Sequence, residues 1–179
     1  MQSELQRRYE AAETRRAELK HTTSALGDAQ LNWSPDAETW SARQIVQHLV
    51  LGDETVGRAC EPGAPKQGMG QYRLVPRAWM RALALGVLNH NIVVPLPLPE
   101  LEPAEYVALP ELFRRWDSAR LETRRVLEGV APGQTPYSHP VVGPLTAVQM
   151  LDLEEAHTKY HMRQMERLMR LPGFPGTDG

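Results

Sequence analysis

Three histidines have the spacing expected of metal ligands. His157 and His161 are four residues apart. If that segment is helical, both imidazole rings lie on one face, about one turn apart. His48 lies in a separate segment that also has a helical pattern. Each histidine falls on the apolar stripe of its helix, where a polar ring is costly unless something bonds it. A divalent metal held between two packed helices would satisfy all three rings.

Three histidines define the chemistry such a metal would supply. Neutral imidazole is a good ligand for zinc, nickel, iron and copper. We expect a divalent metal, zinc or nickel first and iron as a further candidate. With zinc, three protein ligands leave a fourth position for water, which is the catalytic rather than the structural pattern. The metal would lower the pKa of a bound water or thiol. The alternative is that the three rings are ordinary hydrogen-bonded core histidines.

Other polar residues fall near the expected site. Glu154 shares the stripe of His157 and His161, so it could orient a histidine, act as a base or take a metal position itself. Gln164 follows on the same stripe and could bond a bound water. His139 is expected in a loop that could line the pocket. Cys60 is expected to be a spectator, because nothing nearby in sequence activates its thiol.

Four segments have the 3.6-residue periodicity of amphipathic helices. Two of them start with a capping box, Ser41 with Gln44 and Thr146 with Gln149. In a capping box the side chain of each residue accepts a hydrogen bond from the backbone N–H of the other. No strong strand signal is present. Four such helices predict an all-α fold, an up-and-down four-helix bundle. The expected helices cover approximately residues 4–26, 41–61, 111–130 and 146–171.

The connection between the second and third helices is unusually long. Residues 62–110 hold eight of the 15 prolines. Within this stretch, residues 77–88 predict one short apolar helix, and residues 93–99 an extended segment. A connection of this length indicates a crossover rather than a tight hairpin. We expect one domain over residues 1–171 and a flexible tail over 172–179.

Composition excludes several classes of function. The formal net charge is −2, and charged residues make up 23% of the chain, so nucleic acid is not an expected partner. The arginines of residues 7–16 and 114–125 alternate with acidic residues and predict solvated helix faces. The single cysteine, Cys60, excludes an intrachain disulfide and favours a reducing compartment. With no apolar run of membrane length, we expect a cytoplasmic protein without membrane contact.

The sequence resembles a known family. Three segments are similar to the DinB/YfiT superfamily of bacterial helical metalloproteins. The first is Trp40 and Ser41, followed by a helix that carries Gln47, His48 and Leu49. The other two are HPVVGPLT, which begins at His139, and HTKYHMRQ, which begins at His157. The resemblance covers about residues 5–171. It implies a four-helix bundle with a long second connection, and metal ligands at His48, His157 and His161. Family members include metal-dependent hydrolases and thiol S-transferases, and many form dimers.

Two functions follow as hypotheses. In the first, the chain is an enzyme: the metal binds a bacillithiol-type thiol and presents it to an electrophile, with Glu154 as orienter or base, or it supports hydrolysis. In the second, the chain is a non-catalytic stress-response or binding module, a homodimer in which metal is structural or absent.

Overall fold

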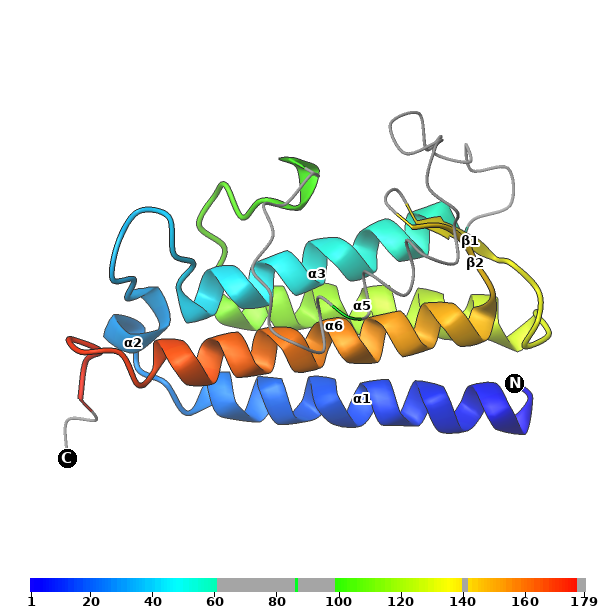
Figure 1. Cartoon of the computed structure of the whole chain (residues 1–179), viewed down its shortest axis with the longest axis horizontal. Helices are drawn as coiled ribbons and strands as arrows, with labels where there is room; N and C mark the ends of the chain where they lie inside the picture. The colour runs from blue at the N-terminus through cyan, green and yellow to red at the C-terminus, as the bar shows by residue number, and fades with distance from the viewer. Residues whose placement is uncertain (61–85, 87–98, 140–141, 177–179) are drawn as a thin grey trace.

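The structure, a computed structural model, describes residues 1–60, 86, 99–139 and 142–176. Four long helices lie side by side in it (Figure 1): α1 (Ser3–Ser24), α3 (Ala42–Ala59), α5 (Leu109–Glu128) and α6 (Ala147–Leu168). They match the four predicted segments to within a few residues at each end, so the expected all-α class is confirmed. The short helix expected over residues 77–88 and the extended segment over 93–99 lie outside the described residues, apart from Gly86 and Pro99.

Both predicted capping boxes are present, and they fix where two helices begin. The hydroxyl of Ser41 accepts from the Gln44 backbone N–H at 3.3 Å, while the Gln44 side chain accepts from the Ser41 N–H at 2.9 Å. Thr146 and Gln149 make the same pair of bonds at 3.2 and 3.0 Å. These are the helices that carry the histidines, so the caps set the axial position of the candidate ligands.

The helices pack in two pairs, α3 against α5 and α1 against α6, and α3 also contacts α6. Figure 1 shows α3 and α5 running in the same direction, with α1 and α6 opposite to them. Two apolar clusters fill the interior, one toward each end of the bundle. The first centres on Leu19, Ile45, Leu112, Trp116 and Met165, and the second on Leu5, Leu127, Tyr137, Met150 and Leu151. The α3–α6 contact is the one that brings His48 to the other two histidines.

Four short elements were not predicted. Helix α2 (Asp28–Asn32) lies between the first two predicted helices, and a 3-10 turn, η1, covers Pro99–Leu101. Strands β1 (Tyr137–His139) and β2 (Gly143–Leu145) pair antiparallel, with Tyr137 opposite Leu145. Gly143 has a φ of 79°, a conformation that glycine adopts without steric cost. The hairpin places Tyr137 in the core, and His139 lies near enough to His157 on α6 for their charges to interact.

The segment after α6 turns back onto α2. The ring of Phe174 meets that of Trp33 edge-on, with centroids 5.5 Å apart, and Gln30 donates to the Pro175 carbonyl at 3.1 Å. The expected tail begins at residue 172, and its last three residues, 177–179, lie outside the described part of the chain. None of the described helices combines the length and apolar character needed to cross a membrane.

Candidate metal centre

The three predicted ligands converge in the bundle interior. The Nε2 atom of His157 lies 3.2 Å from Nε2 of His48 and 3.0 Å from Nε2 of His161. One ligand atom from each ring lies within 4.8 Å of the other two. Zinc binds histidine nitrogen at about 2.0–2.1 Å, which separates neighbouring tetrahedral ligands by about 3.3 Å. Two of the three pairs therefore have the spacing of ligands to one metal ion, and the atoms of the third pair lie within 4.8 Å of each other.

Hydrogen bonds fix the orientation of two rings. The Nδ1 atom of His48 lies 3.0 Å from the Leu101 carbonyl oxygen, and Nδ1 of His161 lies 2.8 Å from Oε1 of Gln164. Both oxygens are acceptors, so each Nδ1 carries the proton and donates. In a neutral ring this leaves the Nε2 lone pair directed at the other histidines. Histidine ligands in metal sites are held by bonds of this kind.

The arrangement also suits a cation on electrostatic grounds. If all three rings are neutral and His157 Nε2 carries a proton, it can donate to Nε2 of His48 or of His161, but not to both. The other Nε2 lone pair then has no donor within the cluster. Burial lowers the pKa of His48, and it lowers that of His161 to about 3, with the charge of His48 adding to the effect. The pKa of His157 falls well below its ordinary value because of burial and the neighbouring histidines. Protonation therefore does not relieve the cluster, whereas one metal ion would engage all three lone pairs.

Aromatic rings cover one side of the cluster. The Trp40 ring lies 4.8 Å from the His48 ring and 6.3 Å from the His161 ring, centroid to centroid. Tyr160 meets His161 edge-on at 5.0 Å. Trp40 precedes the N-cap of α3, so the residue that begins the helix also packs on the candidate ligands.

His139 lies on strand β1 rather than in a loop, so that expectation was wrong. Its Nδ1 accepts from the Val142 backbone N–H at 3.3 Å. Burial lowers the pKa of its ring to about 4, and its charge is one of the influences that lower the pKa of His157. His139 therefore lies near the cluster, although its donor atoms are not among those that converge.

Glu154 is bonded to an arginine rather than to a histidine. Its Oε2 accepts from Nη1 of Arg120 at 2.6 Å, and its carboxyl is not part of the converging group. The role of Glu154 as a base stays a prediction.

Arg120 is 3% exposed, so the expectation that the arginines of residues 114–125 all lie on a solvated face was wrong for this one. The helical spacing of Arg120 in the sequence indicates that its side chain points inward. Arg120 is four residues after Trp116 and three before Thr123, both of which are buried. It therefore belongs to the inward stripe of α5.

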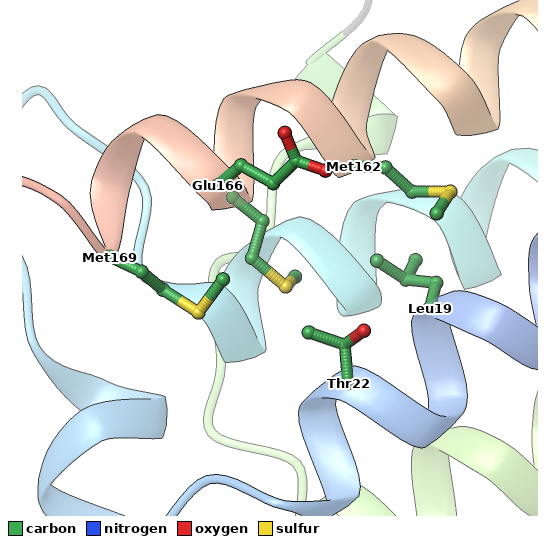
Figure 2. Close-up of a pocket in the computed structure, with 6 residues that line it drawn as sticks. Leu19, Thr22, Met162, Glu166 and Met169 are labelled. Carbon is green, nitrogen blue, oxygen red and sulfur yellow. The ribbon is translucent and has the colours of Figure 1, made fainter. Parts of the chain in front are cut away.

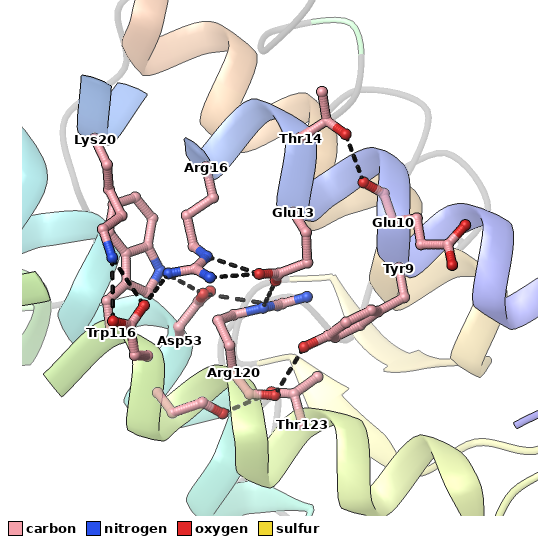
Figure 3. Close-up of polar contacts among 12 residues, drawn as sticks. Tyr9, Glu10, Glu13, Thr14, Arg16, Lys20, Asp53, Trp116, Arg120 and Thr123 are labelled. Atoms are coloured by element: carbon pink, nitrogen blue, oxygen red, sulfur yellow. Dashed lines mark hydrogen bonds and ion pairs between the residues drawn. The ribbon is translucent and has the colours of Figure 1, made fainter. Parts of the chain in front are cut away.

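Arg120 is the centre of a polar network between helices (Figure 3). Its Nε donates to Glu13 on α1 at 2.7 Å, and its Nη1 lies 3.6 Å from Asp53 on α3. With Glu154 on α6, one guanidinium joins side chains from all four long helices. Asp53 also accepts from the indole N–H of Trp116 at 2.7 Å.

Cys60 caps the C-terminal end of α3 and is partly buried. Burial, reinforced by the charge of Glu154, raises the pKa of its thiol to about 12. The thiol therefore stays protonated at neutral pH, which agrees with its expected role as a spectator.

A pocket elsewhere in the molecule offers no comparable chemistry. Between α1 and α6, three methionines, Leu19, Thr22 and Glu166 line a small hollow (Figure 2). Thioether and methyl groups dominate its lining: Met162, Met165 and Met169. The histidine cluster is thus the stronger candidate site.

The comparisons with known proteins agree with the fold and the cluster. Residues 11–165 match the DinB superfamily, and the chain belongs to that family of helical proteins. The chain is also 26% identical over 156 residues to the uncharacterized protein YuaE of Bacillus subtilis (strain 168), an alignment that covers 86% of this chain and 91% of that protein. No solved structure gives a significant match.

Proposed function

We propose that the protein binds one divalent metal ion through His48, His157 and His161, and that the loaded protein is a thiol S-transferase. The observation that carries the first part is the convergence of three Nε2 atoms, two of them with Nδ1 already bonded to an acceptor. Zinc or nickel suits a three-imidazole site, with iron as a further candidate.

Transferase activity is supported by the number of ligands. Among the described residues, no cysteine or carboxylate joins the three histidines. Three protein ligands leave room for a small molecule at the ion, as in catalytic zinc sites. When bound, the metal would deprotonate a coordinating thiol. The histidines would hold the ion, Trp40 would cover one side of it, and Glu154, three residues before His157, would take up or supply a proton.

Metal binding is tested by substitution of each ligand. We expect purified protein to contain zinc, nickel or iron by elemental analysis, and metal-free protein to bind zinc or nickel in calorimetric titration. A metal that binds only the folded state raises the free energy of unfolding by about 2.7 kcal/mol at 100 times its dissociation constant. His48→Ala, His157→Ala and His161→Ala should each lose most of that increase. His21→Ala, on the exposed face of α1, is the matched control and should keep it.

Turnover is tested with a panel of low-molecular-weight thiols, including a bacillithiol-type thiol, against electrophiles that carry a leaving group. We expect conjugation that depends on added metal and disappears in His161→Ala. Hydrolysis of ester or amide substrates without added thiol would favour the hydrolase alternative instead. Metal binding with no turnover by either route would favour a non-catalytic binding module.

A further inference from the structure

Three carboxylates surround the guanidinium of Arg120, whose side chain is 4% exposed. Glu13 Oε1 lies 2.7 Å from Nε, and Glu154 Oε2 lies 2.6 Å from Nη1. Asp53 Oδ2 lies 3.6 Å from the same Nη1. The Glu154 side chain is 10% exposed, and that of Asp53 is 18% exposed. Asp53 and Glu154 thus share a single N–H-bearing nitrogen in the bundle interior.

The charges around Arg120 do not balance. Arg16 is the second cation of the network, and it bonds Glu13 and Asp117. Asp117 is half-exposed and is also bonded by Lys20, so it has its own counter-charge. Among the described residues, Arg16 and Arg120 are then left to neutralise Glu13, Asp53 and Glu154. Within that part of the chain one negative charge is in excess, and an unbalanced buried charge is costly. Binding a proton removes that excess.

The hydrogen bonds distinguish the two carboxylates that share Nη1. Asp53 also accepts from Trp116 Nε1, a bond that favours its ionised form. Glu154 Oε1 is buried and has no hydrogen-bond partner among the described residues, and the same holds for Nη2 of Arg120. Oε1 of Glu154 is therefore the oxygen best placed to carry a proton.

We propose that Asp53 and Glu154 hold one proton between them at neutral pH, and that Glu154 exchanges this proton with substrate at the adjacent histidine centre. The first half stands on the network alone. The second half rests on the proposed function. Glu154 and His157 are three residues apart on one helix, which places their side chains on neighbouring positions of the same face. Asp53 and Arg120 act as positioning residues, through Glu154.

The surroundings of Glu154 support the first half. Burial raises the pKa of Glu154 to about 7, and the charges of Asp53 and Glu13 add to the rise while Arg120 opposes it. Burial likewise raises the pKa of Asp53. Tyr137 on β1 and Cys60 at the end of α3 also interact with Glu154, and both remain neutral because the pKa of each is raised. Arg120 is therefore the cation that faces Glu154 among the described residues.

The proton has a defined use in thiol transfer. A thiol and an electrophile with a leaving group give a thioether and the protonated leaving group. The bond from the electrophilic carbon to the leaving atom breaks, and the O–H of Glu154 supplies the proton that this atom gains. The S–H of the thiol breaks, and its proton restores the carboxyl of Glu154. The pair thus returns to its starting state with one proton.

The test measures the carboxyl groups directly, in metal-free protein without substrate. The side-chain carboxyl carbons of aspartate and glutamate are labelled with carbon-13 and followed by NMR as pH is varied. In wild type we expect one proton to leave the Asp53–Glu154 pair close to neutral pH, well above the 4.5 of an ordinary glutamate. In Asp53→Asn the charges balance, so the pKa of Glu154 should fall by about one pH unit or more. In Glu154→Gln the neutral amide stands in for the protonated carboxyl, so the step near neutral pH should disappear and Asp53 should keep its own lower titration step. Glu122→Gln, on the exposed side of α5 and paired with Arg125, is the control and should change neither.

Two results would overturn the proposal. If both carboxyls of wild type titrate at ordinary values, no proton is held. If Asp53→Asn leaves the pKa of Glu154 as high as before, burial alone accounts for it and the proton is not shared. The wild-type titration decides the first point even if a variant does not fold. Absence of thiol transfer would count against the proposed function and the use of the proton, but not against its presence.

Discussion

At the residue scale, two of the three candidate ligands, His48 and His161, depend on a neighbour that is not a ligand. The carbonyl of Leu101 and the amide of Gln164 each accept the Nδ1 proton of one histidine. Without that acceptor, the ring loses its preferred tautomer and part of its orientation. Gln164 was predicted to lie beside the site, although as a partner of bound water rather than of His161.

We therefore expect Gln164→Leu to weaken metal binding by about 10–100-fold. Leucine has a similar size and keeps the helix, but it cannot accept from His161. Calorimetric titration of the metal-free protein with zinc measures the change. Glu166→Gln, exposed on the same helix, is the control and should bind as wild type does. Equal affinities for Gln164→Leu and wild type would show that the bond does not orient the ligand.

Sequence spacing predicted the three histidines but not the network around Arg120. His157 and His161 are on one helix, so their relative position follows from helical geometry. Arg120, Asp53, Glu13 and Glu154 are on four helices, and their meeting depends on tertiary packing. Interleaved arginines and acids look alike in a sequence whether they are solvated or buried. The position of Arg120 on the inward stripe was the one signal that separated it from its neighbours.

At the element scale, the N-terminal caps of α3 and α6 position the site. His48 lies about two turns into α3, and His157 about three turns into α6. Fraying of either helix start would not reach the histidines directly, but loss of a cap lowers the stability of the whole helix.

We expect Ser41→Ala and Thr146→Ala each to lower the free energy of unfolding by about 0.5–2 kcal/mol, because a backbone N–H loses its acceptor. Urea denaturation followed by circular dichroism measures the loss. Thr14→Ala is the control: Thr14 is exposed in the middle of α1, and its hydroxyl bonds only the Glu10 carbonyl of its own helix. Alanine is the better helix former there, so no loss is expected. A cap variant as stable as this control would contradict the role given to the capping boxes.

The elements that the sequence predicted are those with several turns of periodic pattern. The two strands of the hairpin have three residues each, too few to show an alternation. Helix α2 has five residues among turn formers and gave no periodic signal either. Short elements are stabilised by the core they pack on, and a local sequence does not contain that information.

At the scale of the whole molecule, the buried histidines and Glu154 give opposite dependences of stability on pH. The pKa of His161 is lowered from 6.5 to about 3, so the unfolded chain binds more protons in that range and the metal-free protein loses stability as pH falls through it. The pKa of Glu154 is raised from 4.5 to about 7, so the folded protein binds the extra proton. That contribution is present in acid and is lost as pH rises toward 7.

As pH rises from about 4.5 to 7, we expect the free energy of unfolding of Glu154→Gln to increase more steeply than that of wild type, because the variant lacks the contribution that Glu154 loses over this range. Urea denaturation at a series of pH values, with chelator present, measures both slopes. Glu111→Gln is the control, because the Glu111 side chain is half-exposed and the pKa of its carboxyl is lowered by Arg114, the reverse of Glu154. Parallel curves for Glu154→Gln and wild type in this window would show that Glu154 titrates alike in the folded and unfolded chains.

The position of Trp40 has a practical consequence for work on this protein. The indole ring of Trp40 lies 4.8 Å from the His48 ring and 6.3 Å from the His161 ring, centroid to centroid. We therefore expect its fluorescence to change when an ion binds between these histidines. Of the other described tryptophans, Trp33 packs on Phe174 and Trp116 bonds Asp53. The protein thus carries its own optical reporter at the histidine centre, and binding there is open to measurement by intrinsic fluorescence in unlabelled material.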